Sequence, residues 1–247
     1  MRDSIGFAAA AAMGLASVAY GIPTTTGVGG NGGNAQFPPP NALYSIDDGT
    51  AEDGVGFDGT PGNDLVWMNT FPKVAGAEMI TTISIAFGTP TFPGAATDGT
   101  PVTVCLWSDA DGGSPQNATL LATVGGVVSG ANTNTFVTYD IPDTVVPSNT
   151  VVVGVLMRNA GGGTNPFPCA LDTTPVAEAQ RSFIGWGPTP TVDPSNMLAL
   201  GTNWLAEEAI EPGNWLIRAN GVAVPEPASL GLLGLAAVAL GARRRRA

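Results

Sequence analysis

Short runs of β-branched, aromatic and aliphatic residues alternate with clusters of Gly, Pro and Asp through the middle of the chain. Such runs are too short for independent helices and are typical of strands bounded by turns. Only Trp204–Ile210 resembles a helix, because Thr202 or Asn203 can cap its start and Pro212-Gly213 ends it. The pattern predicts an all-β fold, an antiparallel β-sandwich of jelly-roll type over residues 42–222. The clearest runs predict strands at residues 78–87, 101–108, 118–128, 135–141, 150–158, 181–186 and 214–223.

The N-terminal segment reads as an export signal. Ile5 to Ala16 is a short apolar run of mostly small residues, and Ser17-Val18-Ala19 offers small residues at the spacing that signal peptidase cleaves. We therefore expect a signal peptide at residues 1–19, the alternative being a buried alanine-rich helix. Residues 20–41 are rich in Thr, Gly, Asn and Pro, so they predict a linker.

The C-terminal segment combines three features in order. Pro225, Glu226 and Pro227 are followed by an apolar stretch that predicts a hydrophobic helix at residues 228–242. The stretch from Pro227 to Ala242 has 16 residues, about 24 Å as a helix, which is short for a bilayer but close enough to insert with local thinning. Its basic end places that side in the cytoplasm. This end consists of Arg243, Arg244, Arg245 and Arg246.

This tail, residues 223–247, resembles the PEP-CTERM sorting signal of Gram-negative bacteria in order, spacing and polarity. The resemblance implies that an exosortase, a membrane-embedded cysteine peptidase, recognises Pro225-Glu226-Pro227 and processes the tail during export. Until then the hydrophobic helix would hold the protein in the inner membrane. Proteins with this signal are linked to the cell surface, exopolysaccharide and the biofilm matrix, so we expect such a location here.

A second resemblance concerns the predicted sandwich. Tyr44-Ser45-Ile46-Asp47-Asp48-Gly49 opens it, a middle strand runs into Trp107–Pro115, and Gly213–Ala219 closes it. That order is similar to β-sandwich modules of secreted bacterial surface proteins. The resemblance implies an architecture and no particular ligand.

Composition narrows the functional classes. The absence of histidine excludes Ser-His-Asp and Cys-His catalysis and histidine-ligated zinc. The formal net charge of −11 argues against nucleic acid, whose binding depends on Lys and Arg neutralising phosphates. We therefore do not expect an enzyme. A pair of carboxylates acting on a glycoside is the remaining catalytic alternative.

The two cysteines allow one pairing. Export to an oxidising compartment favours a disulfide between Cys105 and Cys169. The alternative is a buried thiol, because Cys105 lies within an apolar run.

Acidic residues supply the candidate metal ligands. Calcium binds carboxylate and carbonyl oxygens on tight loops, so Asp109 and Asp111 in Asp-Ala-Asp-Gly-Gly, and Asp47 and Asp48 in the first acidic cluster, are candidates. That first cluster continues with Glu52, Asp53 and Asp58. The alternative is that these residues form turns and keep the protein soluble. No other cofactor is expected.

Tryptophan could mark a sugar-binding surface. Trp186 and Trp204 lie near predicted loops, where an exposed ring can stack on a sugar, although burial in the core is the alternative. Trp107 and Trp215 lie in apolar strands and are expected in the core.

These features together predict an exported protein of the cell surface or extracellular matrix. Its ectodomain is expected to be structural or adhesive, with signal peptidase and exosortase as partners during export. The alternative is a module that binds carbohydrate such as exopolysaccharide, with or without calcium. A secreted hydrolase is the third interpretation.

Overall fold

The computed structural model describes residues 44–57, 62–161, 165–174 and 180–224. The predicted signal peptide, the whole of the predicted linker at residues 20–41, and the tail from Pro225 onward lie outside these ranges. Within them, no helix has both the length and the apolar character needed to cross a membrane. The helices of this part are short 3₁₀ turns, and strands make up most of its regular structure.

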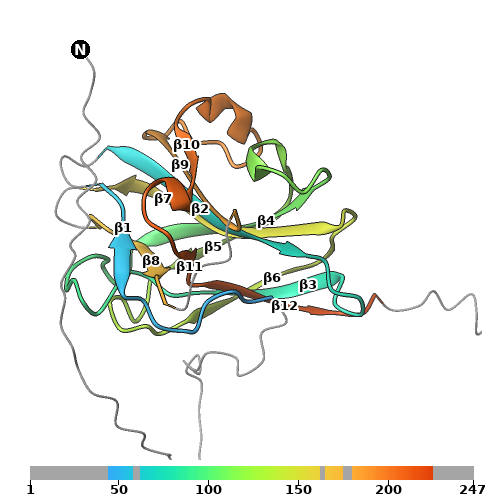
Figure 1. The fold of residues 1–247 in the computed structure, drawn as a ribbon, viewed down its shortest axis with the longest axis horizontal. Coiled ribbons are helices and arrows are strands. Elements are labelled where there is room, and N and C mark those ends of the chain that lie inside the picture. The colour runs from blue at the N-terminus through green and yellow to red at the C-terminus, as the bar shows by residue number, and fades with distance from the viewer. Residues whose placement is uncertain (1–43, 58–61, 162–164, 175–179, 225–247) are drawn as a thin grey trace, which may run out of the picture.

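Antiparallel strands form two stacked layers with a small third sheet at one end (Figure 1). The first layer has six strands, in the spatial order β10 (Trp204–Ala206), β9 (Ser182–Pro188), β2 (Asn63–Pro72), β7 (Thr150–Ala160), β4 (Pro101–Asp109) and β5 (Thr119–Val127). The second layer has β12 (Ile217–Val222), β3 (Met79–Ile85) and β6 (Val137–Val145). The small sheet has β1 (Asp53–Val55), β8 (Cys169–Asp172) and β11 (Asn214–Trp215).

The pairing is nested in the manner of a jelly roll. β4 pairs with β5, β3 with β6 and β2 with β7, so each pair encloses the previous one in sequence. Successive pairs alternate between the two layers. An antiparallel bridge between Tyr44 and Ala219 encloses all of them and joins the two ends of the domain. The all-β, antiparallel sandwich predicted from the sequence is therefore confirmed.

Both faces of the six-stranded sheet are buried. Along β2, Leu65, Trp67 and Phe71 face the principal core between the layers, whereas Val66 and Met68 face a second apolar cluster on the outer side. The outer cluster is covered by the chain around two 3₁₀ turns, η1 (Pro115–Asn117) and η2 (Met197–Leu200). Burial on both sides explains why this strand is a continuous apolar run rather than an alternating one.

The helix predicted at Trp204–Ile210 is wrong. Residues 204–206 form edge strand β10 on β9, and Glu207–Ala209 form a single 3₁₀ turn, η3. Packing across the strands decides this: the Trp204 ring stacks on Phe183 at 6.1 Å between centroids, over the side where Gly185 has no side chain. The run predicted at residues 214–223 is also divided, because β11 pairs with β8 whereas β12 pairs with β3.

The predicted Cys105–Cys169 disulfide is not formed, and both cysteines are buried free thiols. Cys105 lies in the outer cluster because it alternates with Val104 and Leu106, which face the principal core. Cys169 lies in the principal core, so the six-stranded sheet separates the two sulfur atoms. Burial raises the pKa of Cys105 to about 12 and also raises that of Cys169.

Candidate functional site

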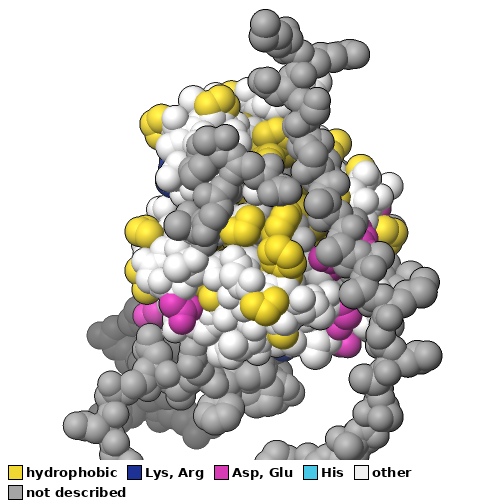
Figure 2. All heavy atoms as spheres, turned by 90° about the vertical axis from the view of Figure 1, so that its left-hand side faces the viewer, with side chains coloured by type: hydrophobic (Ala, Val, Ile, Leu, Met, Phe, Trp, Pro, Cys, Tyr) yellow, Lys and Arg dark blue, Asp and Glu magenta, His cyan; other side chains and the backbone are white. Residues whose placement is uncertain are grey.

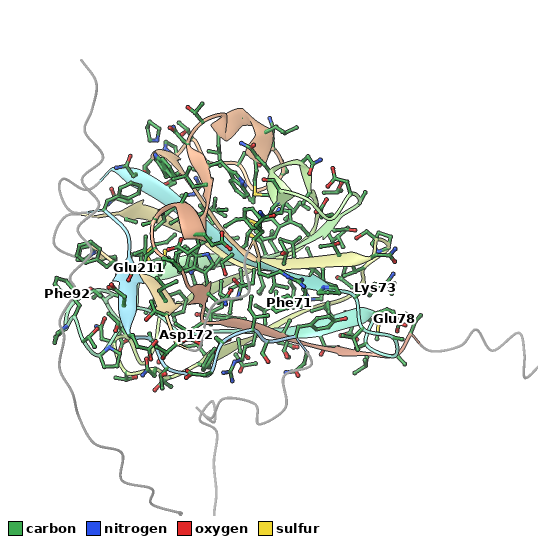
Figure 3. The ribbon with its side chains drawn as sticks, viewed as in Figure 1. Phe71, Lys73, Glu78, Phe92, Asp172 and Glu211 are labelled. Carbon is green, nitrogen blue, oxygen red and sulfur yellow. The ribbon has the colours of Figure 1, made fainter. Side chains whose placement is uncertain are left out.

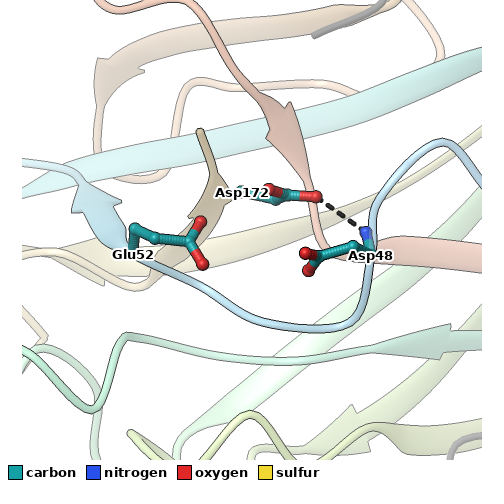
Figure 4. Close-up of side chains that lie close together, drawn as sticks. All are labelled: Asp48, Glu52 and Asp172. Atoms are coloured by element: carbon teal, nitrogen blue, oxygen red, sulfur yellow. Dashed lines mark hydrogen bonds between the residues drawn. The ribbon is translucent and has the colours of Figure 1, made fainter. Parts of the chain in front are cut away.

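Three carboxylates meet beside the small sheet. Asp48, Glu52 and Asp172 each place an oxygen within 4.8 Å of the others (Figure 4). Asp48 and Glu52 precede β1, and Asp172 is the last residue of β8. Asp172 is buried, Glu52 is half-buried and Asp48 is exposed, so the group opens from the protein interior toward solvent.

Strand pairing brings these residues together. β1 runs antiparallel to β8 with Asp53 opposite Leu171, and the peptide N–H of Glu52 donates to the Leu171 carbonyl at 3.1 Å. Glu52 therefore lies beside the end of β8, where the Thr173 N–H donates to its carboxylate at 3.0 Å. The Asp48 N–H donates to Asp172 Oδ2 at 2.7 Å, which fixes the third member.

Neutral donors hold the carboxylates in place. Thr50 donates to Asp48 Oδ1 through its N–H at 2.8 Å and its hydroxyl at 2.6 Å, and that hydroxyl also lies 2.8 Å from Glu52 Oε1. The Thr174 N–H donates to Asp172 Oδ1 at 2.8 Å. These bonds orient the carboxylate oxygens without neutralising their charge.

The electrostatics of the group favour a bound cation. Burial raises the pKa of Asp172 to about 6, the charges of Asp48 and Glu52 add to the rise, and the two N–H donors oppose it. A raised pKa means that the ionised form is held at a cost in the folded protein. Oxygen ligands at this spacing suit hard cations such as Ca²⁺, with water and carbonyl oxygens completing the coordination.

The other calcium candidates behave differently. Asp47 bonds to Arg218 and takes no part in the group of three. Asp109 and Asp111 lie in a turn: Asp109 Oδ1 accepts from the Asp111 N–H at 3.3 Å, and Asp111 Oδ1 accepts from the Gly113 N–H at 3.1 Å. Such bonds from a side chain to a backbone N–H two residues later are those of ordinary Asp turns. Sequence reasoning named Asp48 as a candidate ligand and noted Glu52 only as a member of the same acidic cluster, and it missed Asp172, which follows no acidic run.

The tryptophans divide between core and surface. Trp186 is only 8% exposed and packs edge-to-face on Phe57 in the principal core, so the prediction that it stacks on sugars is wrong. Trp204 is half-buried, and its indole N–H donates to Ser114 Oγ at 2.9 Å. Trp107 and Trp215 are fully buried, as expected.

A pocket of about 420 Å³ opens where β4 begins and β7 ends. The Arg158 side chain, 43% exposed, lies in its wall and forms an ion pair with fully buried Asp64. Asp64 also accepts from the Thr189 hydroxyl at 2.8 Å, so the guanidinium is held by a fixed partner. The pocket is lined by Thr100, Pro101, Val102, Thr103, Leu156, Arg158, Asn159 and Asn165.

Residues 223–246 match the family model described as the PEP-CTERM protein-sorting motif. The chain carries a PEP-CTERM sorting motif. The match includes Pro225-Glu226-Pro227 and all four terminal arginines, which confirms the resemblance drawn from the sequence. The motif implies processing by exosortase and export to the cell envelope. It begins directly after the last strand of the sandwich, β12.

No curated protein matches the sequence. Two similar solved structures are the cysteine protease and lectin-like domains of Cwp84, a surface layer associated protein of Clostridium difficile, and the clostridial cysteine protease Cwp84 after propeptide cleavage. Each shares 15% sequence identity and a TM-score of 0.46 over 66% of this chain. The match covers 33% of the first chain and 37% of the second, so this chain corresponds to about a third of their length.

Proposed function

We propose that this PEP-CTERM protein is a structural or adhesive component of the bacterial cell surface or extracellular matrix. A signal peptide delivers it, exosortase processes its tail, and the jelly roll is the part displayed outside. The observation that carries the proposal is the sorting motif at residues 223–246, joined directly to a folded β-sandwich. A module displayed in this way needs a stable fold more than a reactive centre.

The composition and packing of the domain agree with a structural or adhesive role. Only 12% of the residues are charged, and the acidic excess gives a net charge of −11, which favours solubility outside the cell. Apolar clusters on both faces of the main sheet make the domain rigid. The lack of histidine leaves carboxylate chemistry as the remaining route to hydrolysis.

Localisation in a bacterium that has an exosortase tests this proposal. The wild-type protein should reach the surface fraction and become accessible to added protease on intact cells. A variant with Pro225→Ala, Glu226→Ala and Pro227→Ala should stay in the inner membrane, whereas Ser229→Ala, a matched change just after the motif, should behave as the wild type. Surface display of the triple variant, or failure of the wild type to leave the inner membrane, would refute the proposal.

The pocket beside Arg158 supports carbohydrate binding as a second candidate function. Because Asp64 balances its charge, the guanidinium offers hydrogen-bond donors without a net positive charge. Asn159 and Thr103 add polar groups, and Leu156 adds an apolar surface. This mixture suits a neutral sugar, whose ring has hydroxyl edges and apolar faces. Between residues 20 and 224 there are 18 acidic and four basic residues, an excess that disfavours polyanionic glycans.

Glycan binding by the mature protein, with one pair of variants, tests this second function. Asn159 has φ +55°, a conformation that glycine adopts without strain, so Asn159→Gly removes the amide and preserves the fold. Gln180→Gly, at φ +59° and outside the pocket, makes the same backbone change as a control. Retention on a neutral polysaccharide should fall at least tenfold in Asn159→Gly and persist in Gln180→Gly. Equal retention of the two variants would refute the pocket as the binding site.

Calcium dependence of that binding rests on the cluster of Asp48, Glu52 and Asp172. Asp48→Asn removes one exposed negative charge and keeps the shape of the side chain. If calcium at this cluster supports binding, glycan retention in Ca²⁺ should exceed retention in EDTA for the wild-type protein, and the difference should shrink in Asp48→Asn. Equal retention in both buffers would refute calcium dependence.

A further inference from the structure

Among the described residues, the two larger sheets end in the edge strands β10, β5, β12 and β6. An edge strand exposes unpaired N–H and C=O groups, and proteins guard such edges with short length, bulges, charged side chains or proline. Three of these strands are guarded in this way. β10 has only three residues, and β12 has a bulge between Asn220 and Gly221. β6 carries Asp140, Pro142 and Asp143.

β5 lacks these guards over most of its length. It contains no charged residue and no proline. A bulge leaves Leu121 unopposed, but Ala122 to Val127 then run in regular register opposite Leu106 to Pro101 of β4. Val127, at the end of the strand, is 52% exposed. β5 therefore presents a regular, uncharged edge to solvent.

Pairing with β4 decides which backbone groups of this edge are free. Pro101 lies opposite Val127 and has no N–H to share, whereas the Val128 N–H donates to the Thr100 carbonyl at 2.9 Å. Hydrogen-bonded and non-hydrogen-bonded pairs alternate along antiparallel strands, so alternate residues of β5 point their N–H and C=O groups away from β4. These residues are Thr123, Gly125 and Val127.

β6 of the other layer lies beside this edge. The Tyr139 ring packs where a side chain at Gly126 would stand, and its hydroxyl donates to the Val127 carbonyl at 2.9 Å. That carbonyl keeps a second lone pair for another donor. In the part of the chain that the structure describes, the outward backbone groups of Thr123, Gly125 and Val127 have no backbone partner.

Acidic side chains gather at the ends of the sandwich instead. Figure 3 labels Asp172 and Glu211 at one end and Glu78 at the opposite end. Figure 2 shows the first of these ends, where acidic side chains form separate groups on the face. Two copies that met through either end would bring like charges together, whereas the edge of β5 carries no charge.

We propose that β5 pairs with β5 of a second copy of this protein, so that the two main sheets become one continuous sheet across a twofold axis. With Gly125 opposite Gly125 of the second copy, Thr123 lies opposite Val127 of that copy, and the outward groups of each strand face those of the other. Opposed residues in this antiparallel register exchange N–H···O=C bonds. Because this edge is complementary to itself, a second copy satisfies its free groups and closes the interface as a dimer.

The size and charge of this interface predict a weak dimer. One pair of strands buries far less than the roughly 1,200–2,000 Å² of a typical stable complex. Asp140 and Asp143 are exposed on β6, and the twofold axis would bring them toward the same residues of the second copy. Their repulsion is screened by salt, so salt should strengthen the dimer. A dimer of this kind would hold neighbouring domains together where the protein is crowded.

Because this pairing names a partner of the displayed domain, it rests on the proposed structural role. The two can fail separately. A failure of export would appear in the localisation of the wild-type protein, whereas a failure of pairing would appear only in the association of the folded domain.

Sedimentation of the exported protein, with its tail processed, tests the pairing. As the protein concentration is raised, monomers should convert to dimers and not to larger assemblies, and added NaCl should increase the conversion. Amide hydrogen exchange in residues 119–127 should slow as the dimer forms, because free N–H groups of β5 become bonded.

Two changes at Gly125 should act in opposite directions. A Cβ at this position meets no atom within 4 Å, so Gly125→Lys and Gly125→Val both fit the monomer. Gly125→Lys places two positive charges opposite each other and should weaken the dimer about fivefold, although it lowers the overall negative charge of the protein. Gly125→Val adds a β-branched residue and should strengthen the dimer about threefold. Val222→Lys, on β12 and 45% exposed in the wild type, is the control for added charge and should not weaken the dimer.

Three results would overturn the proposal. One is a protein that stays monomeric at every concentration, including as Gly125→Val. Another is a dimer that Gly125→Lys leaves unchanged. The third is slow exchange of residues 119–127 in a protein that is strictly monomeric, which would assign the edge to another segment of the same chain.

Discussion

Arg218 and Asp47 form an ion pair that closes the jelly roll. Arg218 Nη2 lies 2.6 Å from Asp47 Oδ1, and Nε lies 3.0 and 3.1 Å from the two carboxylate oxygens. The guanidinium also stands over the ring of Phe136, 4.4 Å from its centroid. Asp47 follows Tyr44 and Arg218 precedes Ala219, so the pair reinforces the bridge between the two ends of the domain.

Replacing only one partner of this pair should destabilise the domain. Arg218→Met would leave the fully buried Asp47 carboxylate without its cation, and we expect the free energy of unfolding to fall by about 3 kcal/mol. Burial raises the pKa of Asp47 despite the opposing effect of Arg218, so the cost of burying this carboxylate offsets much of the attraction within the pair. The double variant Asp47→Asn, Arg218→Met should therefore recover at least half of the loss. Urea denaturation measures the free energy of unfolding of the single and the double variant. Equal stability of the two variants would contradict this account.

The pH dependence of stability should report on Asp172. Its pKa is about 6 in the folded protein and lower in the unfolded chain, so the folded state binds this proton more tightly. The resulting stabilisation is complete below about pH 4 and is lost as pH rises through 6. In EDTA, Asp172→Asn should therefore gain stability relative to the wild type as pH is raised from 4.5 to 7.5. Parallel curves for the two proteins would show that Asp172 does not titrate in this range.

Thiol labelling tests the burial of the two cysteines. Both should be unreactive toward a thiol reagent in the native protein, because each is buried and its pKa is raised. Both should react after unfolding in the absence of any reductant. Fewer than two reactive thiols in the unfolded, unreduced protein would mean that a disulfide forms after all.

The sequence predicted the fold class well because turn residues and short β-branched runs are local signals. It missed β2, whose residues Leu65 to Met68 form a continuous apolar run, because alternation disappears when both faces of a strand are buried. It misread Trp204–Ile210 because capping residues are local, whereas the contact between Trp204 and Phe183 depends on strands meeting in space.

The candidate sites were hard to predict for the same reason: most of their residues meet only when strands come together in space. Asp48 and Glu52 were recognisable because they lie in one acidic segment, but only the pairing of β1 with β8 brings Asp172 to them. The burial of Glu207 gave no signal, because it fell within the helix predicted at Trp204–Ile210 and nothing local marks one glutamate of this acidic segment as buried. The position of Trp186 near a loop suggested exposure, yet Phe57 covers it. The sorting tail could be identified in full from the sequence, because its motif consists of consecutive residues.

The most direct test of the central claim is mass spectrometry of the C-terminus of native protein from membrane, surface and medium fractions. If exosortase sorts this protein, the surface and medium forms should lack the tail from Leu230 to Ala247, and only a membrane-bound precursor should retain it. An intact Arg243–Ala247 end on protein found outside the inner membrane, or intact protein confined to that membrane, would contradict the account.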